Sequence, residues 1–323
     1  MNKVPERPMW ERDITELREE EHAQALAGAG EPEPVAAISD ISAGGVPGRL
    51  YWPARHHGGM FVWLHGGAWM LGNPVSHDSL ARAFANRIGC AVLSVDYRRA
   101  PEHRYPAATD DAWQATCWAA GVFSKVAVGG DSAGGNLAAA VALRARDAGL
   151  PLALQVLVYP VLDCDLDAPY REDFVARHDD PGDATALGVD WRANMRYIWQ
   201  EYVPDQEQRL APDASPFHAP TLAGLAPALF ITVGRDILRA ESEQYARRLA
   251  TAGVQAAVRN YPEASHGFIH LLAAAPDARS AVDTSAEAVR RAFGYGLTGK
   301  PGNMGSTASK ADINQQITGI PDI

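Results

Sequence analysis

Short apolar runs alternate with longer segments of helical periodicity over most of this chain. Six of the runs are apolar nearly throughout and have the length of strands. They span residues 60–65, 91–96, 125–130, 152–160, 227–234 and 254–261. The segments between several of them, such as DSLARAFANRIG and ESEQYARRLATAG, have helical patterns. Strands without a polar face, separated by helices, are typical of a mostly parallel sheet covered on both sides. The pattern therefore predicts an α/β fold.

The N-terminal segment has a different pattern. Trp10, Ile14, Leu17 and Leu26 recur at roughly helical spacing between about residues 8 and 27, among many Glu and Arg residues. Such an amphipathic helix needs an apolar surface to cover. Because it precedes the first predicted strand, we expect residues 1–45 to form a helical cap segment rather than part of the core.

One segment interrupts the alternation within the main domain, predicted over residues 46–294, and another follows that domain. Residues 165–215, approximately, are polar and rich in Asp and Pro, and they contain the aromatic helix DWRANMRYIWQEYV. An insertion of this length between two strands favours a cap or binding element. Residues 295–323 are rich in Gly, Ser and Thr, which predicts a flexible tail.

Composition and charge exclude several classes of function. The formal net charge is −10, and no basic stripe appears, which argues against nucleic acid or an anionic membrane surface as a partner. The three cysteines are widely spaced, lie in or beside apolar segments and have no zinc-ligand spacing, so we expect buried free thiols and no metal. The N-terminus is charged and no long apolar run occurs, so we expect no stable membrane insertion and a cytoplasmic location.

The segment VAVGGDSAGGNLAAA carries the first sign of chemistry. Val126 and Val128 belong to a predicted strand, and a helix is predicted from Ala133 to about Ala148. Ser132 therefore lies on the turn between them, flanked by Gly130 and Gly134. A turn this tight leaves no room for bulky neighbours and presents the serine oxygen above the sheet. The pattern is typical of a nucleophile elbow.

A serine nucleophile needs a base and an acid that orients the base. His266, in YPEASHGF, follows the last predicted strand; His270 also lies late in the chain, but within an apolar segment that favours a core role. Asp236 follows the strand ending at Gly234, at the same edge of the sheet as Ser132. Glu241 and Glu263 are the rival acids. The order Ser132, Asp236, His266 is the order of an α/β-hydrolase.

An oxyanion also requires preorganised N–H donors. Gly66 and Gly67, in WLHGGAW, directly follow a predicted strand, where the missing Cβ atoms allow backbone N–H groups to face an oxygen. The N–H of Ala133, after the nucleophile, is the third predicted donor. Four independent parts in the expected order make a chance match improbable.

Taken together, these and other motifs resemble one family. The chain from about Tyr51 to Leu272 looks like the hormone-sensitive lipase family of α/β-hydrolases, in the GDSAG branch of bacterial carboxylesterases. The motifs that carry the resemblance are HGGAW, DYRRAPEHRYPAATDD, GDSAGGN, YPVLDCD, DASP, GRDILRAE and YPEASHGF. The resemblance implies that His65 shapes the oxyanion loop, that Asp131 braces the elbow and that the N-terminal helix joins the cap. GRDILRAE departs from the family pattern, with Ile237 for Pro and Ala240 for Asp.

The sequence leaves three functions open. The first is a serine carboxylesterase acting on short- to medium-chain acyl esters through an acyl-enzyme, without a cofactor. The second is a lactone or amide hydrolase specialised for one metabolite, and the third is a non-catalytic ligand receptor on the same fold. Trp69, Trp199 and Phe268 are candidate substrate-binding residues, although core packing explains each equally well. A small-molecule ester is the expected partner, and a homodimer is an expectation from the family.

Overall fold

A single eight-stranded sheet organises the chain. The computed structural model describes residues 7–171 and 191–295. Within them the sheet order is β1-β2-β4-β3-β5-β6-β7-β8. The pairs β1–β2 and β2–β4 are antiparallel, and the other five neighbouring pairs are parallel. The strands are β1 (Ala37–Ala43), β2 (Val46–Trp52), β3 (Met60–Leu64), β4 (Ala91–Val95), β5 (Val126–Asp131), β6 (Gln155–Val158), β7 (Ala228–Arg235) and β8 (Ala256–Ser265). The predicted mostly parallel α/β fold is confirmed.

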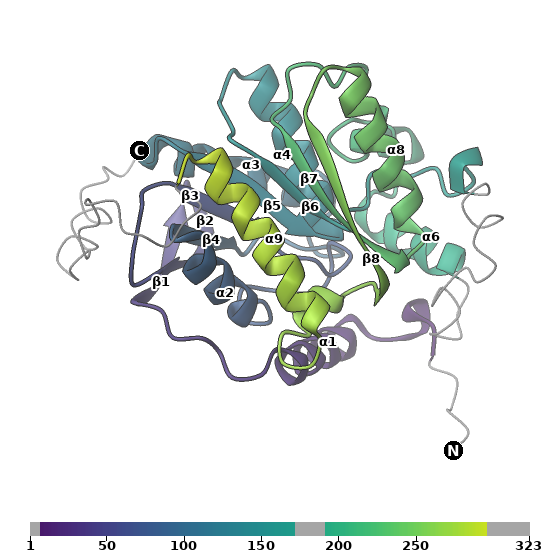
Figure 1. The fold of residues 1–323 in the computed structure, drawn as a ribbon. Helices are drawn as coiled ribbons and strands as arrows, with labels where there is room; N and C mark the ends of the chain where they lie inside the picture. The colour runs from purple at the N-terminus through teal and green to yellow at the C-terminus, as the bar shows by residue number, and fades with distance from the viewer. Residues whose placement is uncertain (1–6, 172–190, 296–323) are drawn as a thin grey trace.

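Helices cover both faces of this sheet (Figure 1). The long ones are α1 (Ile14–Ala29), α2 (Asp78–Ile88), α3 (Ala107–Val122), α4 (Ala133–Asp147), α6 (Trp191–Tyr202), α8 (Leu238–Thr251) and α9 (Pro276–Ala292). The short ones are η1 (Met9–Glu11), α7 (Gln206–Arg209), η3 (Pro216–His218) and η4 (Phe268–His270). Within the described ranges, no helix combines the length and the apolar character that crossing a membrane requires.

The core has two layers, one on each face of the sheet. Strand β3 shows why: Met60 and Val62 point into one cluster, whereas Phe61 and Trp63 point into the other, and all are fully buried. Alternate residues of a strand face opposite sides, so a strand buried on both sides is apolar throughout. Helices α3, α4 and α8 contribute to the first cluster, and α2 and α9, which lie side by side in Figure 1, contribute to the second.

The hairpin of β1 and β2 was not predicted. Residues 37–43, within the segment expected to form only a helical cap, pair with 46–52 at one edge of the sheet. Strand β1 alternates half-buried and exposed residues and contains Ser39, Asp40 and Ser42, so it lacks the apolar run that identified the central strands. The six predicted strands therefore omit β1 and β2 at this edge of the sheet.

The N-terminal helix also differs in detail from the prediction. A single helix was expected from about residue 8 to residue 27, but η1 ends at Glu11 and α1 begins at Ile14. Asp13 caps α1 by accepting a hydrogen bond from the Thr15 N–H, which favours a helix start at this point. Helix η1 contacts the predicted aromatic helix α6, which brings the two predicted cap elements together.

Other predictions fall partly or wholly outside the described residues. The predicted cap insertion is described only up to Arg171 and from Trp191 onward, and of the predicted tail only Tyr295 is described. All three cysteines are free, as expected, but only Cys90 is buried; the expected burial of Cys117 and Cys164 was wrong, since both are partly exposed.

Candidate active site

Ser132 occupies a sharp turn between β5 and α4. Its φ of 54° lies in the left-handed region, which non-glycine residues rarely adopt and which stores strain. The turn is held from both sides, because the Ser132 N–H donates to the Val158 carbonyl at 2.8 Å and the Ser132 carbonyl accepts from the Asn136 N–H at 3.1 Å. The surrounding structure therefore fixes this unusual conformation.

The two glycines around Ser132 are required by the backbone of their neighbours. A Cβ at Gly130 would lie 2.3 Å from the Gly134 carbonyl oxygen, and a Cβ at Gly134 would lie 1.9 Å from the Leu64 carbonyl oxygen. Both distances are far below van der Waals contact, and backbone atoms cannot move aside as a flexible side chain can. The spacing of the glycines in GDSAG thus follows from the close approach of the turn to β3.

Ser132, His266 and Asp236 form one hydrogen-bonded chain. His266 Nε2 lies 3.0 Å from Ser132 Oγ, and His266 Nδ1 lies 2.7 Å from Asp236 Oδ2. The other carboxylate oxygen of Asp236 accepts a hydrogen bond from the Leu238 N–H at 2.9 Å. Asp236 is buried, whereas the His266 side chain is 41% exposed. The structure therefore brings the three predicted residues together, with the imidazole accessible to a bound molecule.

The environment of His266 favours a proton on its ring. Burial alone lowers the pKa of the imidazole, but the neighbouring Asp236 carboxylate outweighs this effect, and the pKa of His266 is raised. The Tyr159 ring packs against the imidazole with centroids 4.5 Å apart. Tyr159 itself has a positive φ of 34°, so it too is held in an uncommon conformation by its surroundings.

The rival residues lie elsewhere. Glu241 is fully buried and accepts hydrogen bonds from the Arg171 guanidinium and the Asp163 N–H rather than from a histidine. Glu263 is exposed on β8. His270 is directed to Asp131, with its Nε2 3.0 Å from Asp131 Oδ2. Of the acids weighed from the sequence, only Asp236 contacts His266.

The loop after β3 passes next to the nucleophile elbow. Gly67 has a φ of 113°, and a Cβ there would lie 2.6 Å from the Leu71 carbonyl group, so only glycine fits without strain. Gly66, however, donates its N–H to Asp131 Oδ1 at 2.9 Å. This donor is thus engaged by the protein itself. No described residue accepts a hydrogen bond from the N–H of Gly67, and Ala133, as the first residue of α4, has no acceptor within its helix.

Contacts with Tyr97, Arg18 and Arg99 hold the loop after β3 in place. The ring of His65 stacks on Tyr97 with centroids 4.1 Å apart, and the Tyr97 hydroxyl donates to the His65 carbonyl at 2.7 Å. Arg18 of α1 donates to the Met70 carbonyl at 2.9 Å, and Arg99 donates to the Gly72 carbonyl. No local sequence pattern identifies Arg18, because its partners lie more than fifty residues away.

The three candidate substrate-binding aromatics are buried. Trp69 stacks on Tyr202 with centroids 4.1 Å apart and also contacts Trp199, so it joins the loop after β3 to helix α6. Phe268 packs against Tyr159 and Tyr261 in the second core cluster. In this structure all three act as packing residues, and their contact with a substrate stays a prediction.

Two groups of side chains have the composition of metal ligands. His77, Asp131 and His270, next to the elbow, present ligand atoms within 4.8 Å of one another, and so do Asp163 and Cys164 of the segment after β6 together with His218 of η3. Hydrogen bonds already join the members of each group, His270 to Asp131 and His218 to Asp163.

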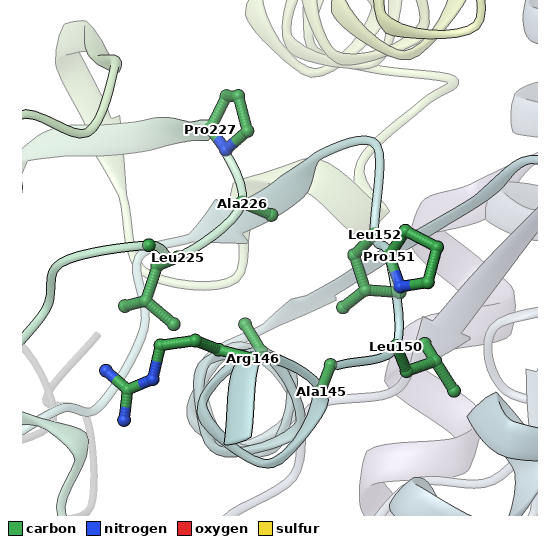
Figure 2. Close-up of a pocket in the computed structure, with 10 residues that line it drawn as sticks. Ala145, Arg146, Leu150, Pro151, Leu152, Leu225, Ala226 and Pro227 are labelled. Atoms are coloured by element: carbon green, nitrogen blue, oxygen red, sulfur yellow. The ribbon is translucent and has the colours of Figure 1, made fainter. Parts of the chain in front are cut away.

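A surface pocket lies at the amino ends of the parallel strands, between the end of α4 and the loops that lead into β6 and β7 (Figure 2). It is remote from Ser132, because Ser132 lies at the carboxyl ends of the strands.

Comparisons with known proteins agree with this geometry. A family model described as alpha/beta hydrolase fold matches residues 61–270. Carboxylesterase NlhH of Mycobacterium tuberculosis is 38% identical over 263 residues, which cover 77% of this chain and 79% of that protein. An ethyl acetate hydrolase of Pseudomonas putida is 33% identical over 283 residues, covering 82% and 86%. A solved esterase structure from Pyrobaculum calidifontis is similar with a TM-score of 0.80 and 34% identity, covering 90% of this chain and 95% of that one. The chain therefore belongs to the α/β-hydrolase fold family, in the hormone-sensitive lipase branch that its motifs resemble.

Proposed function

We propose that this protein is a serine carboxylesterase that hydrolyses short- to medium-chain acyl esters through an acyl-enzyme intermediate. The observation that carries the proposal is the hydrogen-bonded chain from Ser132 Oγ through His266 to the buried Asp236 carboxylate. A hydroxyl becomes a good nucleophile only when a positioned base accepts its proton, and this chain provides that base. The relatives named as esterases support the choice of an ester as the substrate.

The proposed first half-reaction transfers the acyl group to the protein. Ser132 Oγ attacks the acyl carbon while His266 Nε2 accepts the hydroxyl proton. Negative charge develops on the former carbonyl oxygen, and the N–H groups of Gly67 and Ala133 donate to it. His266 then gives its proton to the departing alcohol. Asp236 stays ionised, holds the ring in the tautomer that accepts at Nε2, and stabilises the imidazolium.

The second half-reaction restores the free enzyme. His266 removes a proton from water, the resulting hydroxide attacks the acyl-enzyme, and the same donors hold the second oxyanion. Collapse releases the carboxylic acid and returns the proton to Ser132. Every step uses side chains and backbone groups of this chain. Gly66 has no part in the proposed oxyanion hole, because its N–H donates to Asp131.

The remaining expectations about organisation belong to the same proposal. We assign the N-terminal segment and the insertion containing α6 to a cap over the acyl pocket, supported by the contact between η1 and α6. The division into residues 1–45, 46–294 and 295–323, the cytoplasmic location and the homodimer stay predictions.

Hydrolysis of a p-nitrophenyl ester series from acetate to laurate tests the proposal. The parent protein should hydrolyse the short and medium members, and Ser132→Ala should hydrolyse none above the uncatalysed rate. If the parent is inactive on the whole series while a fluorophosphonate still labels Ser132, the substrate is a specialised lactone or amide instead. Absence of both hydrolysis and labelling would leave the non-catalytic receptor.

A further inference from the structure

One buried carboxylate joins three segments of the candidate active site. Asp131 directly precedes Ser132 and is 3% exposed. Its Oδ1 accepts the N–H of Gly66 at 2.9 Å, and its Oδ2 lies 3.0 Å from His270 Nε2. The elbow, the loop that carries Gly67 and the turn that carries His266 therefore meet at this side chain.

His270 links Asp131 to the His266 turn. It lies in η4 (Phe268–His270), four residues after His266, and Gly267 between them has a positive φ of 82°. Strand β8 ends at Ser265, so η4 is the first regular structure beyond the sheet on this side. The turn between Ser265 and η4 is otherwise held by the hydrogen bond from His266 to Asp236 and by the burial of Phe268 and Ile269.

The carboxylate that holds His270 is ionised. Burial raises the pKa of Asp131, but the imidazoles of His270 and His77 outweigh this effect and hold the pKa far below its usual range. A hydrogen bond from an N–H to an ionised acceptor is roughly twice as strong as one between neutral groups. The hydrogen bond from His270 to Asp131 therefore has a charged acceptor.

From these contacts we propose that His270 is a positioning residue for the proposed esterase reaction, which holds the His266 turn against the elbow and the oxyanion loop through the Asp131 carboxylate. The inference rests on the proposed function. Its physical basis is that a general base must lie within hydrogen-bond reach of the proton it accepts, and a shift of about 1 Å costs on the order of 100-fold in rate. Asp131 would transmit any movement of η4 to both Ser132 and Gly66.

His77 supports His270 from the other side. The two rings meet edge to face with centroids 4.4 Å apart, and His77 Nδ1 lies 3.0 Å from Ser76 Oγ. His77 Nε2 lies 3.5 Å from Asp131 Oδ1 and has no hydrogen-bond partner among the described residues. His270 is thus the histidine that hydrogen-bonds to Asp131, and His77 packs behind it.

The essential property of His270 in this account is an N–H donor at the position of Nε2. His270→Gln retains an amide N–H at about that reach, His270→Asn has the same group on a shorter side chain, and His270→Phe retains the ring without the donor. His103→Phe is the control for the substitution itself, because His103 is exposed and no hydrogen bond, ion pair or ring contact joins its side chain to the other described residues of this cluster.

The readouts are kcat and KM on a p-nitrophenyl ester and the second-order rate constant for fluorophosphonate labelling of Ser132. His270→Phe should lower kcat and the labelling rate by about 10- to 100-fold with KM changed less than about threefold. His270→Gln should stay within about fivefold of the parent, whereas His270→Asn should resemble His270→Phe. His103→Phe should be unchanged. Because labelling needs no ester substrate, it reports on His266 even if the parent proves to hydrolyse some other acyl compound.

Three results would overturn the inference. The first is equal kcat and labelling rate in His270→Phe and the parent. The second is equal impairment of His270→Gln and His270→Asn, since this would show that an N–H donor at the position of His270 Nε2 has no role. The third is loss of parental activity in a chelator such as EDTA, because His77, Asp131 and His270 would then act as ligands of a cation rather than through the hydrogen bond. If His270→Phe does not fold, the comparison of His270→Gln with His270→Asn still tests the positioning role of His270.

Discussion

Asp236 and His266 directly follow two residues that pair across the sheet. Arg235 of β7 is in register with Ser265 of β8, so the next residue on each strand leaves the sheet at the same edge. A register shift between Val233 and Arg235 precedes this pair. Such irregularities redirect side chains near active sites. The 2.7 Å contact between Asp236 Oδ2 and His266 Nδ1 is therefore a product of strand register rather than of a flexible loop.

The pH dependence of hydrolysis should reveal this contact. His266 must be neutral to accept the serine proton, and its raised pKa means that kcat/KM should fall as the pH decreases through a value above the usual histidine value of about 6.5. In Asp236→Asn the carboxylate charge is gone, so this acid limb should move to lower pH, and kcat should fall by about 10⁴-fold. Initial rates between pH 5 and 9 measure both effects.

Glu263→Gln provides the matched control for the pH profile. It removes an exposed carboxylate from β8, the strand that precedes His266, and leaves the His266–Asp236 contact in place. Its profile should coincide with that of the parent. An unchanged acid limb in Asp236→Asn would contradict the assignment of Asp236.

Gly134→Ala tests the packing of the elbow. The new Cβ would meet the Leu64 carbonyl at 1.9 Å and the His65 carbonyl at 2.5 Å, so the elbow must move away from β3. We expect a loss of about 3 kcal/mol or more in the free energy of unfolding, together with loss of hydrolysis. Gly121→Ala in α3 is the control, since nothing lies within 4 Å of its Cβ position; it should be neutral or stabilise by up to about 1 kcal/mol. Denaturant unfolding compares the two, and an elbow variant as stable and active as the parent would refute the steric account.

The buried pair of Arg171 and Glu241 should stabilise the fold rather than take part in the reaction. Both side chains are fully buried, and the guanidinium donates to Glu241 Oε2. Arg171→Met leaves a carboxylate buried beside the Asp163 N–H alone, which should cost about 3–5 kcal/mol of unfolding free energy. The double variant Arg171→Met/Glu241→Leu should recover most of that loss. A double variant less stable than the single one would show that Glu241 has a further role.

Trp199 and Phe268 should differ in their effect on substrate preference. Replacement of either by Ala should cost about 3–5 kcal/mol, because each fills a buried space. Trp199 belongs to α6 and contacts Trp69 next to the oxyanion loop, so Trp199→Ala should shift the preferred acyl chain to longer esters. Phe268 packs against Tyr159 and Tyr261, so Phe268→Ala should leave the order of preference unchanged. The ester series measures this order, and the same shift in both variants would contradict the distinction.

The central sheet and the three site residues could be predicted from local patterns. Strands buried on both sides are apolar throughout, and Ser132, Asp236 and His266 follow strands whose carboxyl ends share one edge. Strand β8 was predicted to end at Tyr261, but it continues to Ser265. The apolar run ends too early to identify the whole strand, because β8 lies at the edge of the sheet and several of its residues are exposed. The four residues between Tyr261 and His266, expected to form a loop, are therefore strand.

Other features depend on contacts between distant segments. The use of the Gly66 N–H by Asp131, the Arg18 contact with Met70 and the pairing of Arg171 with Glu241 each join residues that are 52 to 70 positions apart. No periodicity or local motif contains this information. The edge hairpin was missed for a related reason, since the polar residues of β1 obtain their structure from pairing with β2.

The most direct test of the account is to identify the atom that a fluorophosphonate modifies. The parent should take up one phosphonyl group per chain, located on Ser132 by mass spectrometry of peptides, and ester hydrolysis should disappear in proportion to the labelling. Ser132→Ala should remain unlabelled and inactive. Labelling at another residue, or hydrolysis that persists in fully labelled protein or in Ser132→Ala, would contradict the assignment of Ser132 as the nucleophile.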